Sequence, residues 1–283
     1  MRILPRPPVP GDLLRHYRRS LKARPAPEAV NAVVFRPLGY LVARGLLGTP
    51  VRPIHLVLLH TCLGIVAGLA ILAGRERWAA AVLQVVTVLD NADGQLARLR
   101  GEETELGRYA DTELDAVKNA VLLAAIGRRI GRVRRAALAF VVLTAVLSWD
   151  FNVEYLYRAA RGERFRPEVR DEDGFWLMLA RSIYRALFAP QDRAIRWLER
   201  QAFRCSTGCR DERSDCARAW WGREVVWLGA NLGLSTQYVW LGIFLLTRRL
   251  ETALAFLLGQ AAVPVLSVVV RWLVFRCRRR RSP

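Results

Sequence analysis

The sequence predicts an all-α membrane protein with six transmembrane helices, and three observations support this prediction. Hydrophobic residues make up 53% of the 283 residues, although the formal net charge is +19. The apolar residues gather into long runs, and the cations, nearly all of them Arg, stand beside these runs. A membrane protein with basic margins fits this combination better than a soluble domain does. The position of the Arg residues indicates anionic lipid headgroups as the partner and argues against nucleic acid.

The chain begins with a segment unlike the rest. Residues 1–30 are rich in Pro and Arg and are expected to form a flexible basic N-terminus, without the hydrophobic core of a signal peptide. Over residues 31–47, apolar residues recur at helical spacing and are interrupted by Arg36 and Arg44. This pattern predicts an amphipathic helix that lies in the membrane interface. Residues 31–283 are therefore assigned to one membrane domain.

Six apolar segments follow, and each approaches the ~20 residues needed to cross the hydrocarbon of a bilayer. They cover roughly residues 54–73, 79–97, 106–126, 136–151, 224–247 and 250–270. With both chain ends on the cytoplasmic side of the cell membrane, most Lys and Arg residues lie inside, as the positive-inside rule requires. The Arg cluster at residues 128–135 is the exception. The loop between the second and third spans then faces the cytoplasm.

Four carboxylates, Asp90, Asp93, Asp111 and Asp115, lie at the edges of the second and third spans. An ionised Asp in or near hydrocarbon costs about 2.5–3.5 kcal/mol, so a group of four requires a compensating cation. Residues three or four apart share a helix face, which places Asp90 with Asp93 and Asp111 with Asp115. Two such pairs facing each other form an all-oxygen site that suits Mg²⁺ or Mn²⁺. The alternative is a surface network of Asp and neighbouring Arg residues.

The residues between and beside these carboxylates favour the metal site, because they follow the spacing D-x2-D-G-x2-A-R-x8-G-x3-D-x3-D. This run resembles the signature of the CDP-alcohol phosphotransferases at all eight fixed positions. These are Asp90, Asp93, Gly94, Ala97, Arg98, Gly107, Asp111 and Asp115. The resemblance implies a membrane enzyme that displaces CMP from a CDP-linked donor by an alcohol acceptor, with two Mg²⁺ or Mn²⁺ ions.

The resemblance also implies roles for individual residues. Asp90 and Asp111 would contact both ions, Asp93 the first ion, and Asp115 the second ion as well as acting as the general base. The implied donor contacts are Pro53, Ile54, His55, Leu56, Gly94, Arg98 and Thr104. The family commonly reads Pro-Asn-x-x-Thr where this chain reads Pro-Ile-His-Leu-Val, so polar groups are missing on the nucleotide side. His55 either helps to hold the donor or is a plain interfacial residue.

The preferred reaction transfers a phosphatidyl group from CDP-diacylglycerol to a small polar alcohol, as in phospholipid biosynthesis, and the family analogy suggests a homodimer. A soluble CDP-alcohol donor with a lipid acceptor would suit the apolar surroundings equally well. A non-enzymatic ion-binding membrane protein is the competing class, and the complete set of four Asp residues argues against it. The sequence does not identify the acceptor alcohol.

Lys118 lies three residues after Asp115 and shares its helix face. A Lys at this depth should form an ion pair or shift its pKa. It either tunes Asp115 or contacts an anionic acceptor, or else it is a structural partner that makes the carboxylates tolerable in the membrane.

Residues 151–223 form a long basic insertion between the fourth and fifth spans. Trp176, Leu179 and Ile183 recur at helical spacing, and Pro190 interrupts the pattern before a second basic stretch. We expect two interfacial helices here, which form either a lid over the site or a solvated insertion without a catalytic part. Cys205, Cys209 and Cys216 lack a nearby His and are interpreted as reduced thiols rather than as a zinc site.

Overall fold

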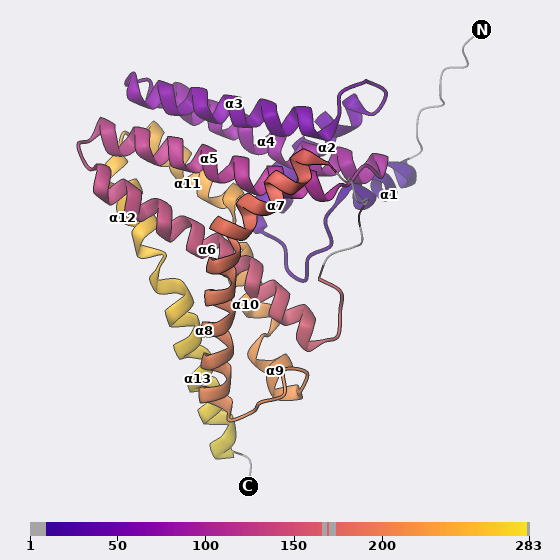
Figure 1. Cartoon of the computed structure of the whole chain (residues 1–283), viewed down its shortest axis with the longest axis vertical. Coiled ribbons are helices and arrows are strands. Elements are labelled where there is room, and N and C mark those ends of the chain that lie inside the picture. The colour runs from indigo at the N-terminus through magenta and orange to yellow at the C-terminus, as the bar shows by residue number, and fades with distance from the viewer. Residues whose placement is uncertain (1–9, 166–168, 170–173, 282–283) are drawn as a thin grey trace.

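The computed structural model describes residues 10–165, 169 and 174–281, and within these ranges it is helical and contains no β-strand. The predicted all-α class is therefore confirmed (Figure 1). The helices are α1 (Pro10–Ser20), a short π-helix (Asn31–Phe35), α2 (Arg36–Leu46), α3 (Pro53–Leu72), α4 (Glu76–Arg100), α5 (Glu105–Arg129), α6 (Val133–Ala160), α7 (Phe175–Leu187), α8 (Ala189–Thr207), α9 (Asp215–Trp220), α10 (Arg223–Ala230), α11 (Leu234–Leu246), α12 (Leu250–Gly259) and α13 (Ala262–Arg281).

Helix α3 organises the part of the fold that carries the predicted site. It packs closely against both α4 and α5 (Figure 1). Helices α4 and α5 make little direct contact with each other. Helices α2 and α11 pack on the other sides of α4. The shared core of this region consists of small and branched apolar side chains, among them Ala67, Ile71, Leu83 and Ile126, which are all fully buried. Side chains of α4 and α5 can thus face each other beside α3.

The turn between α4 and α5 is built from local signals. Helix α4 ends at Gly101, whose φ of 64° is a left-handed conformation that glycine adopts without strain. Helix α5 begins after Thr104, whose Oγ1 accepts a hydrogen bond from the backbone N–H of Gly107 at 3.0 Å. The two pairs of carboxylates are therefore carried by the last turns of one helix and the early turns of the next.

Close packing of α3 against α5 depends on a stripe of small residues. His60, Gly64 and Gly68 are spaced four residues apart, so they lie on one face of α3. A Cβ atom on Gly68 would lie 2.7 Å from Cγ1 of Val121 on α5, and one on Gly64 would lie 2.9 Å from the side chain of Lys118. The missing side chains allow the two helices to approach.

Three stretches are long and apolar enough to cross a membrane: Pro53–Leu72, Val133–Ala160 and Leu250–Cys277, the last of which covers α12 and most of α13. Helices α4 and α5 are 25 residues long but carry more charge. The six-span topology therefore stays a prediction. The same holds for the interfacial placement of α2, although Leu41 on this helix is 62% exposed.

The segment predicted as the fifth span, residues 224–247, is divided into α10 and α11. The division has a tertiary cause that the local sequence does not show. Glu28 reaches the first turn of α11, where its Oε1 accepts hydrogen bonds from the backbone N–H and the hydroxyl of Thr236 at 2.7 and 2.8 Å. A Cβ atom on Gly233 would lie 3.0 Å from the Glu28 carboxylate. A distant carboxylate thus caps a helix that begins inside the apolar run.

The fourth predicted span, residues 136–151, is longer in the structure because α6 continues to Ala160. Polar residues in its last turns have partners from elsewhere in the chain. Glu154 accepts a hydrogen bond from Nε of Arg24 at 2.9 Å, and Asn152 donates to Asp192 at 2.9 Å. These contacts allow an apolar helix to continue through a polar stretch.

The first 30 residues contain more structure than the composition indicates. Residues 1–9 of this predicted flexible N-terminus lie outside the described residues, whereas Pro10–Ser20 form α1. Arg24 is held by Asp150 of α6 at 2.8 Å as well as by Glu154. The segment after α1 is therefore attached to the helical bundle by buried ion pairs.

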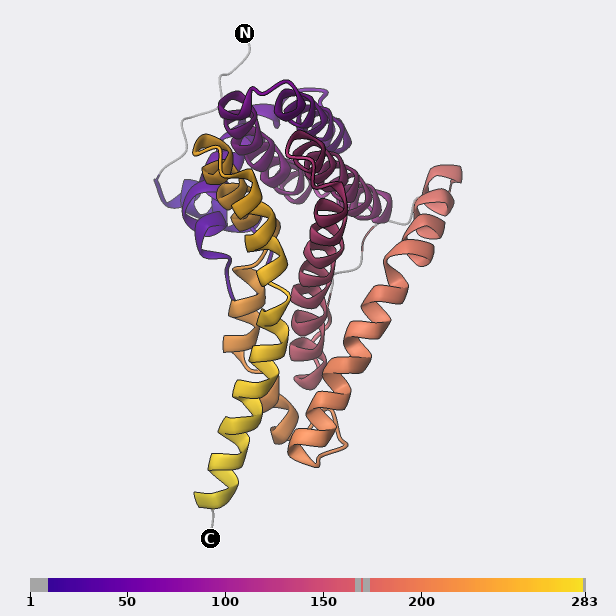
Figure 2. The same ribbon diagram turned by 90° about the vertical axis from the view of Figure 1, so that its left-hand side faces the viewer.

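Within the insertion, α7 and α8 lie where the pattern predicts two helices, and the short helix α9 follows them. Helix α8 packs against α6 and α13 (Figure 2). Glu199 on α8 pairs with Arg271 on α13 at 3.0 Å, and both side chains are buried. Trp149 of α6 donates its indole N–H to the same carboxylate at 2.8 Å. Phe175 and Trp176 on α7 are exposed at 70% and 67%, which fits an interfacial helix.

We predict that Gly68→Ala destabilises the protein, because the new methyl group would meet a β-branched side chain that cannot easily rotate away. Overpacking of this kind typically costs about 1–3 kcal/mol. The matched control is Gly45→Ala on α2, where a Cβ atom would meet no atom within 4 Å. Thermal unfolding in detergent is monitored by size-exclusion chromatography. It should show a lower unfolding midpoint for Gly68→Ala alone. Equal midpoints for the two variants would contradict the packing argument.

Candidate metal centre

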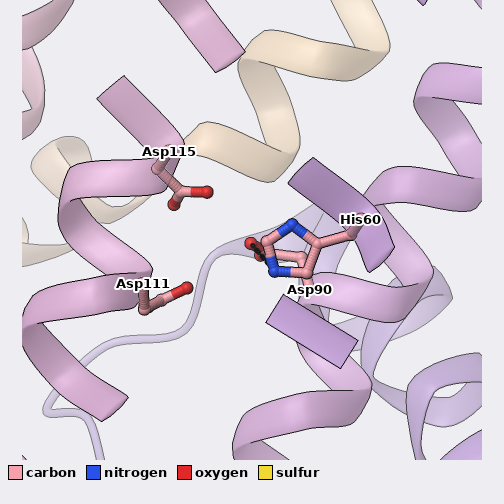
Figure 3. A group of neighbouring side chains, drawn as sticks. All are labelled: His60, Asp90, Asp111 and Asp115. Carbon is pink, nitrogen blue, oxygen red and sulfur yellow. Dashed lines mark ion pairs between the residues drawn. The ribbon is translucent and has the colours of Figure 1, made fainter. Parts of the chain in front are cut away.

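Three helices bring one His and three Asp side chains to one point. His60 comes from α3, Asp90 from α4, and Asp111 and Asp115 from α5 (Figure 3). One ligand atom from each side chain can be chosen so that all four atoms lie within 4.8 Å of one another. Figure 3 shows Asp111 and Asp115 pointing from the same helix toward His60 and Asp90. The structure thus brings three of the four predicted carboxylates directly together.

The chemistry of this group fits a divalent cation. Oδ1 of Asp90 is buried and accepts no hydrogen bond from any described residue. A buried oxygen without a donor is unfavourable unless a cation or water compensates it. Carboxylate oxygens are the ligands that Mg²⁺ and Mn²⁺ prefer. Among the residues that the structure describes, no second group of three or more His, Cys, Asp or Glu side chains comes together in this way.

Asp93, the fourth predicted carboxylate, joins the cluster through His60. Its Oδ2 lies 3.0 Å from Nε2 of His60, and Nδ1 of the same ring lies 2.8 Å from Nζ of Lys118. An ammonium group can only donate hydrogen bonds, so Nδ1 is the acceptor and Nε2 carries the hydrogen. His60 therefore donates to Asp93. Because both ring nitrogens are engaged, the ring orients a carboxylate and a lysine and is not itself positioned as a ligand.

Lys118 is completely buried and pairs with Asp115, as its shared helix face predicts. Its Nζ lies 2.6 Å from Oδ1 of Asp115 and 3.7 Å from Oδ1 of Asp90. The site thus contains one fixed positive charge among four carboxylates. By contrast, Nε of Arg98 donates to the backbone carbonyl of Ser20, and Arg100 donates to the backbone carbonyls of Thr49 and Val51. These contacts of Arg98 and Arg100 count against the surface network of Asp and Arg.

Comparison with known proteins agrees with this geometry. Residues 51–167, which include α3, α4 and α5, match the family model described as CDP-alcohol phosphatidyltransferase. Residues 51–167 of this chain are thus similar to the CDP-alcohol phosphatidyltransferases.

A curated relative is the "Bifunctional IPC transferase and DIPP synthase" of Rubrobacter xylanophilus, which is 31% identical over 102 residues. These residues make up 36% of this chain and 23% of the relative, so the chain matches about a quarter of the relative's length. The similarity to the CDP-alcohol phosphatidyltransferases, together with the three apolar stretches, indicates a membrane protein.

Gly94 and Arg98 of the sequence motif form one structural unit. A Cβ atom on Gly94 would lie 3.2 Å from both terminal nitrogens of Arg98, so the glycine leaves room for the guanidinium group. The Nε hydrogen bond to Ser20 at the end of α1 fixes this group in place. The planar cation is thus held one helical turn beyond Asp93, where it suits a phosphate. Its contact with the donor stays a prediction.

The other predicted donor contacts have structural partners. Thr104 caps α5, as described above. Pro53 begins α3, and Nδ1 of His55 in the first turn accepts a hydrogen bond from the backbone N–H of Arg52 at 3.1 Å. Leu56 is buried in an apolar cluster that includes Leu96. A contact of Pro53, Ile54, His55 or Leu56 with a nucleotide stays a prediction.

His60 is the residue of this cluster that the sequence does not predict. A signal was present, because an ionisable residue inside an apolar span is often functional. His60 also stands four residues before Gly64, so it faces α5 through the same stripe. The family signature begins at Asp90 and therefore does not point to α3.

The carboxylate cluster is also connected to the insertion. Arg181 on α7 pairs with Glu105 in the first turn of α5, with Nε 3.2 Å from Oε1. The rings of Tyr109 and Tyr184 lie 5.2 Å apart across the same pair of helices. Helix α7 thus packs against the end of α5 from which Asp111 projects, while a role as a lid stays a prediction.

We predict that Mn²⁺ or Mg²⁺ raises the thermal midpoint of the wild-type protein, because an ion that binds only the folded state stabilises it. Asp90→Asn should weaken this binding strongly. Loss of an outer-shell partner typically costs about 10–100-fold in metal affinity, so loss of a ligand should cost about 100-fold or more. Asp215→Asn, at a carboxylate that is 96% exposed, is the matched control and should respond like the wild type. An unchanged ion response in Asp90→Asn would contradict the site.

Proposed function

We propose that this chain is a membrane phosphotransferase that displaces CMP from a CDP-linked donor by the hydroxyl group of an alcohol acceptor. The observation that carries the proposal is the convergence of Asp90, Asp111 and Asp115 within 4.8 Å beside the buried His60. The family match of residues 51–167 supports the same chemistry. A reaction of this kind requires a bound pyrophosphate, a neutralised leaving group and a base for a weakly acidic hydroxyl.

The residues divide this work among them. Asp90, Asp93 and Asp111 would hold a divalent ion, Mg²⁺ or Mn²⁺, which when bound neutralises the phosphate oxygens and polarises the phosphorus that is attacked. Arg98 would contact a phosphate of the donor. Asp115 would take the proton from the acceptor hydroxyl, and its ion pair with Lys118 holds the carboxylate in position for this role.

The same residues bear on how many divalent ions the site holds. The family resemblance implies two ions, with Asp115 as a ligand of the second. Lys118 lies where this second ion would bind, 2.6 Å from Asp115 and 3.7 Å from Asp90.

For the donor, we favour CDP-diacylglycerol with a small polar alcohol as the acceptor. A lipid-tailed substrate suits a site between apolar helices such as α3, whose Leu58 and Leu69 are exposed at 50% and 58%. The Rubrobacter relative is named as a transferase and a synthase, which supports group transfer in general. The runner-up is a soluble CDP-alcohol donor with a lipid acceptor, since the same surroundings would accommodate either arrangement.

We further propose a multi-pass protein of six spans, with the site facing the cytoplasm. Exposed apolar side chains on α13, including Val265, Leu266 and Val270 at 57–63%, are suited to lipid. The excess of Lys and Arg on the side of the α4–α5 turn supports the orientation. A homodimer is proposed from the family resemblance.

The test is CMP release by purified protein in lipid vesicles, with labelled CDP-diacylglycerol and a panel of alcohols. We predict release that depends on Mg²⁺ or Mn²⁺ and that falls by about 10²–10⁴-fold in Asp115→Asn, the range expected for loss of a general base. Binding of Mn²⁺ by this variant should remain. Asp215→Asn serves again as the exposed control.

A second arm supplies soluble CDP-alcohols with lipid acceptors, and the position of the label in the product identifies which substrate carries the tails. Release only in this arm would favour the runner-up. If the protein binds Mn²⁺ but releases no CMP in a metal-dependent way from any CDP-linked donor, a non-enzymatic ion-binding protein becomes the better interpretation.

A further inference from the structure

Lys118 occupies a central position in the cluster of carboxylates. Its side chain is 0% exposed, and its ammonium group lies 2.6 Å from Asp115, 2.8 Å from His60 and 3.7 Å from Asp90. These neighbours come from all three helices that build the site. The ammonium group is therefore a permanent cation inside the centre.

The position of this ammonium group is built into the packing. Gly64 on α3 leaves the space that the lysine side chain fills, since a Cβ atom there would lie 2.9 Å from both Cγ and Cδ of Lys118. His60, one turn earlier on the same face, accepts a hydrogen bond from Nζ and donates to Asp93. A side chain held along its stem and at its tip has little freedom to leave.

The same carboxylates would be needed by a second divalent ion. Mg²⁺ binds oxygen at about 2.0–2.1 Å and tolerates little distortion of its coordination. Oδ1 of Asp115 already has a cation at 2.6 Å, and that cation also faces Asp90. A second ion between Asp90 and Asp115 would have to displace the ammonium group or bind against its charge.

We propose that Lys118 replaces the second metal ion, so that this chain binds one divalent ion, at Asp90, Asp93 and Asp111, and uses a lysine ammonium group beside Asp115. The proposal rests on the proposed function for the identity of the site. Lys118 is a positioning residue: it fixes the orientation of Asp115 and leaves that carboxylate free of metal.

The experiment counts Mn²⁺ ions per chain by electron paramagnetic resonance, using purified protein in vesicles of zwitterionic lipid and no CDP substrate. We expect one ion for the wild type. Lys118→Met keeps the volume and removes the charge, and we expect it to bind two ions, with the magnetic coupling of a close pair. Two metal ions that share ligands in such sites lie about 3.5–4 Å apart. Lys22→Met, a substitution at the other, exposed lysine of the chain, should bind one ion.

Two ions in the wild type, or one ion in a folded Lys118→Met protein, would overturn the proposal. No ion in the wild type would overturn it as well. If Lys118→Met does not fold, Lys118→Gln removes the charge while keeping a donor for His60, and the wild-type count decides independently of either variant. CMP release is measured separately. One bound ion without CMP release would reject the proposed function alone, whereas two ions with CMP release would reject this inference alone.

Discussion

The central constraint on this structure is the placement of four carboxylates inside an apolar helical bundle. Ionised carboxylates in such surroundings are unfavourable unless cations or hydrogen-bond donors face them. Lys118 faces Asp115 and Asp90, and His60 faces Asp93. These two side chains offset part of the negative charge of the carboxylates. The remaining negative charge strongly attracts a divalent cation.

The helix arrangement follows from this constraint. Were α4 and α5 packed tightly against each other, their carboxylates would have no room to converge. Instead α3 packs against both of them, and its small residues Gly64 and Gly68 bring its backbone close to α5. His60, on the same stripe, then reaches carboxylates of α4 and the lysine of α5. One helix thus supplies the packing surface and the polar contacts.

The sequence predicts those features whose causes are local. Helix periodicity places Lys118 beside Asp115, and the spacing of the motif predicts two carboxylate pairs on consecutive helices. Features whose causes lie far away in the sequence were not predicted. The break between α10 and α11 depends on Glu28, which precedes its hydrogen-bond partner Thr236 by 208 residues. His60 likewise requires knowledge of how α3 packs, because nothing in its immediate neighbours indicates a metal centre.

Gly64 and Lys118 form a mutually dependent pair, which has a consequence for the chemistry. A methyl group at position 64 would meet the middle of the lysine side chain at 2.9 Å and push its ammonium group away from Asp115. Asp115 would then lose its fixed partner, and the space beside it would open to water or to a second ion. The absence of a side chain on α3 thereby keeps the lysine ammonium group beside a carboxylate on α5. In this chain the helix that carries no carboxylate sets the surroundings of Asp115.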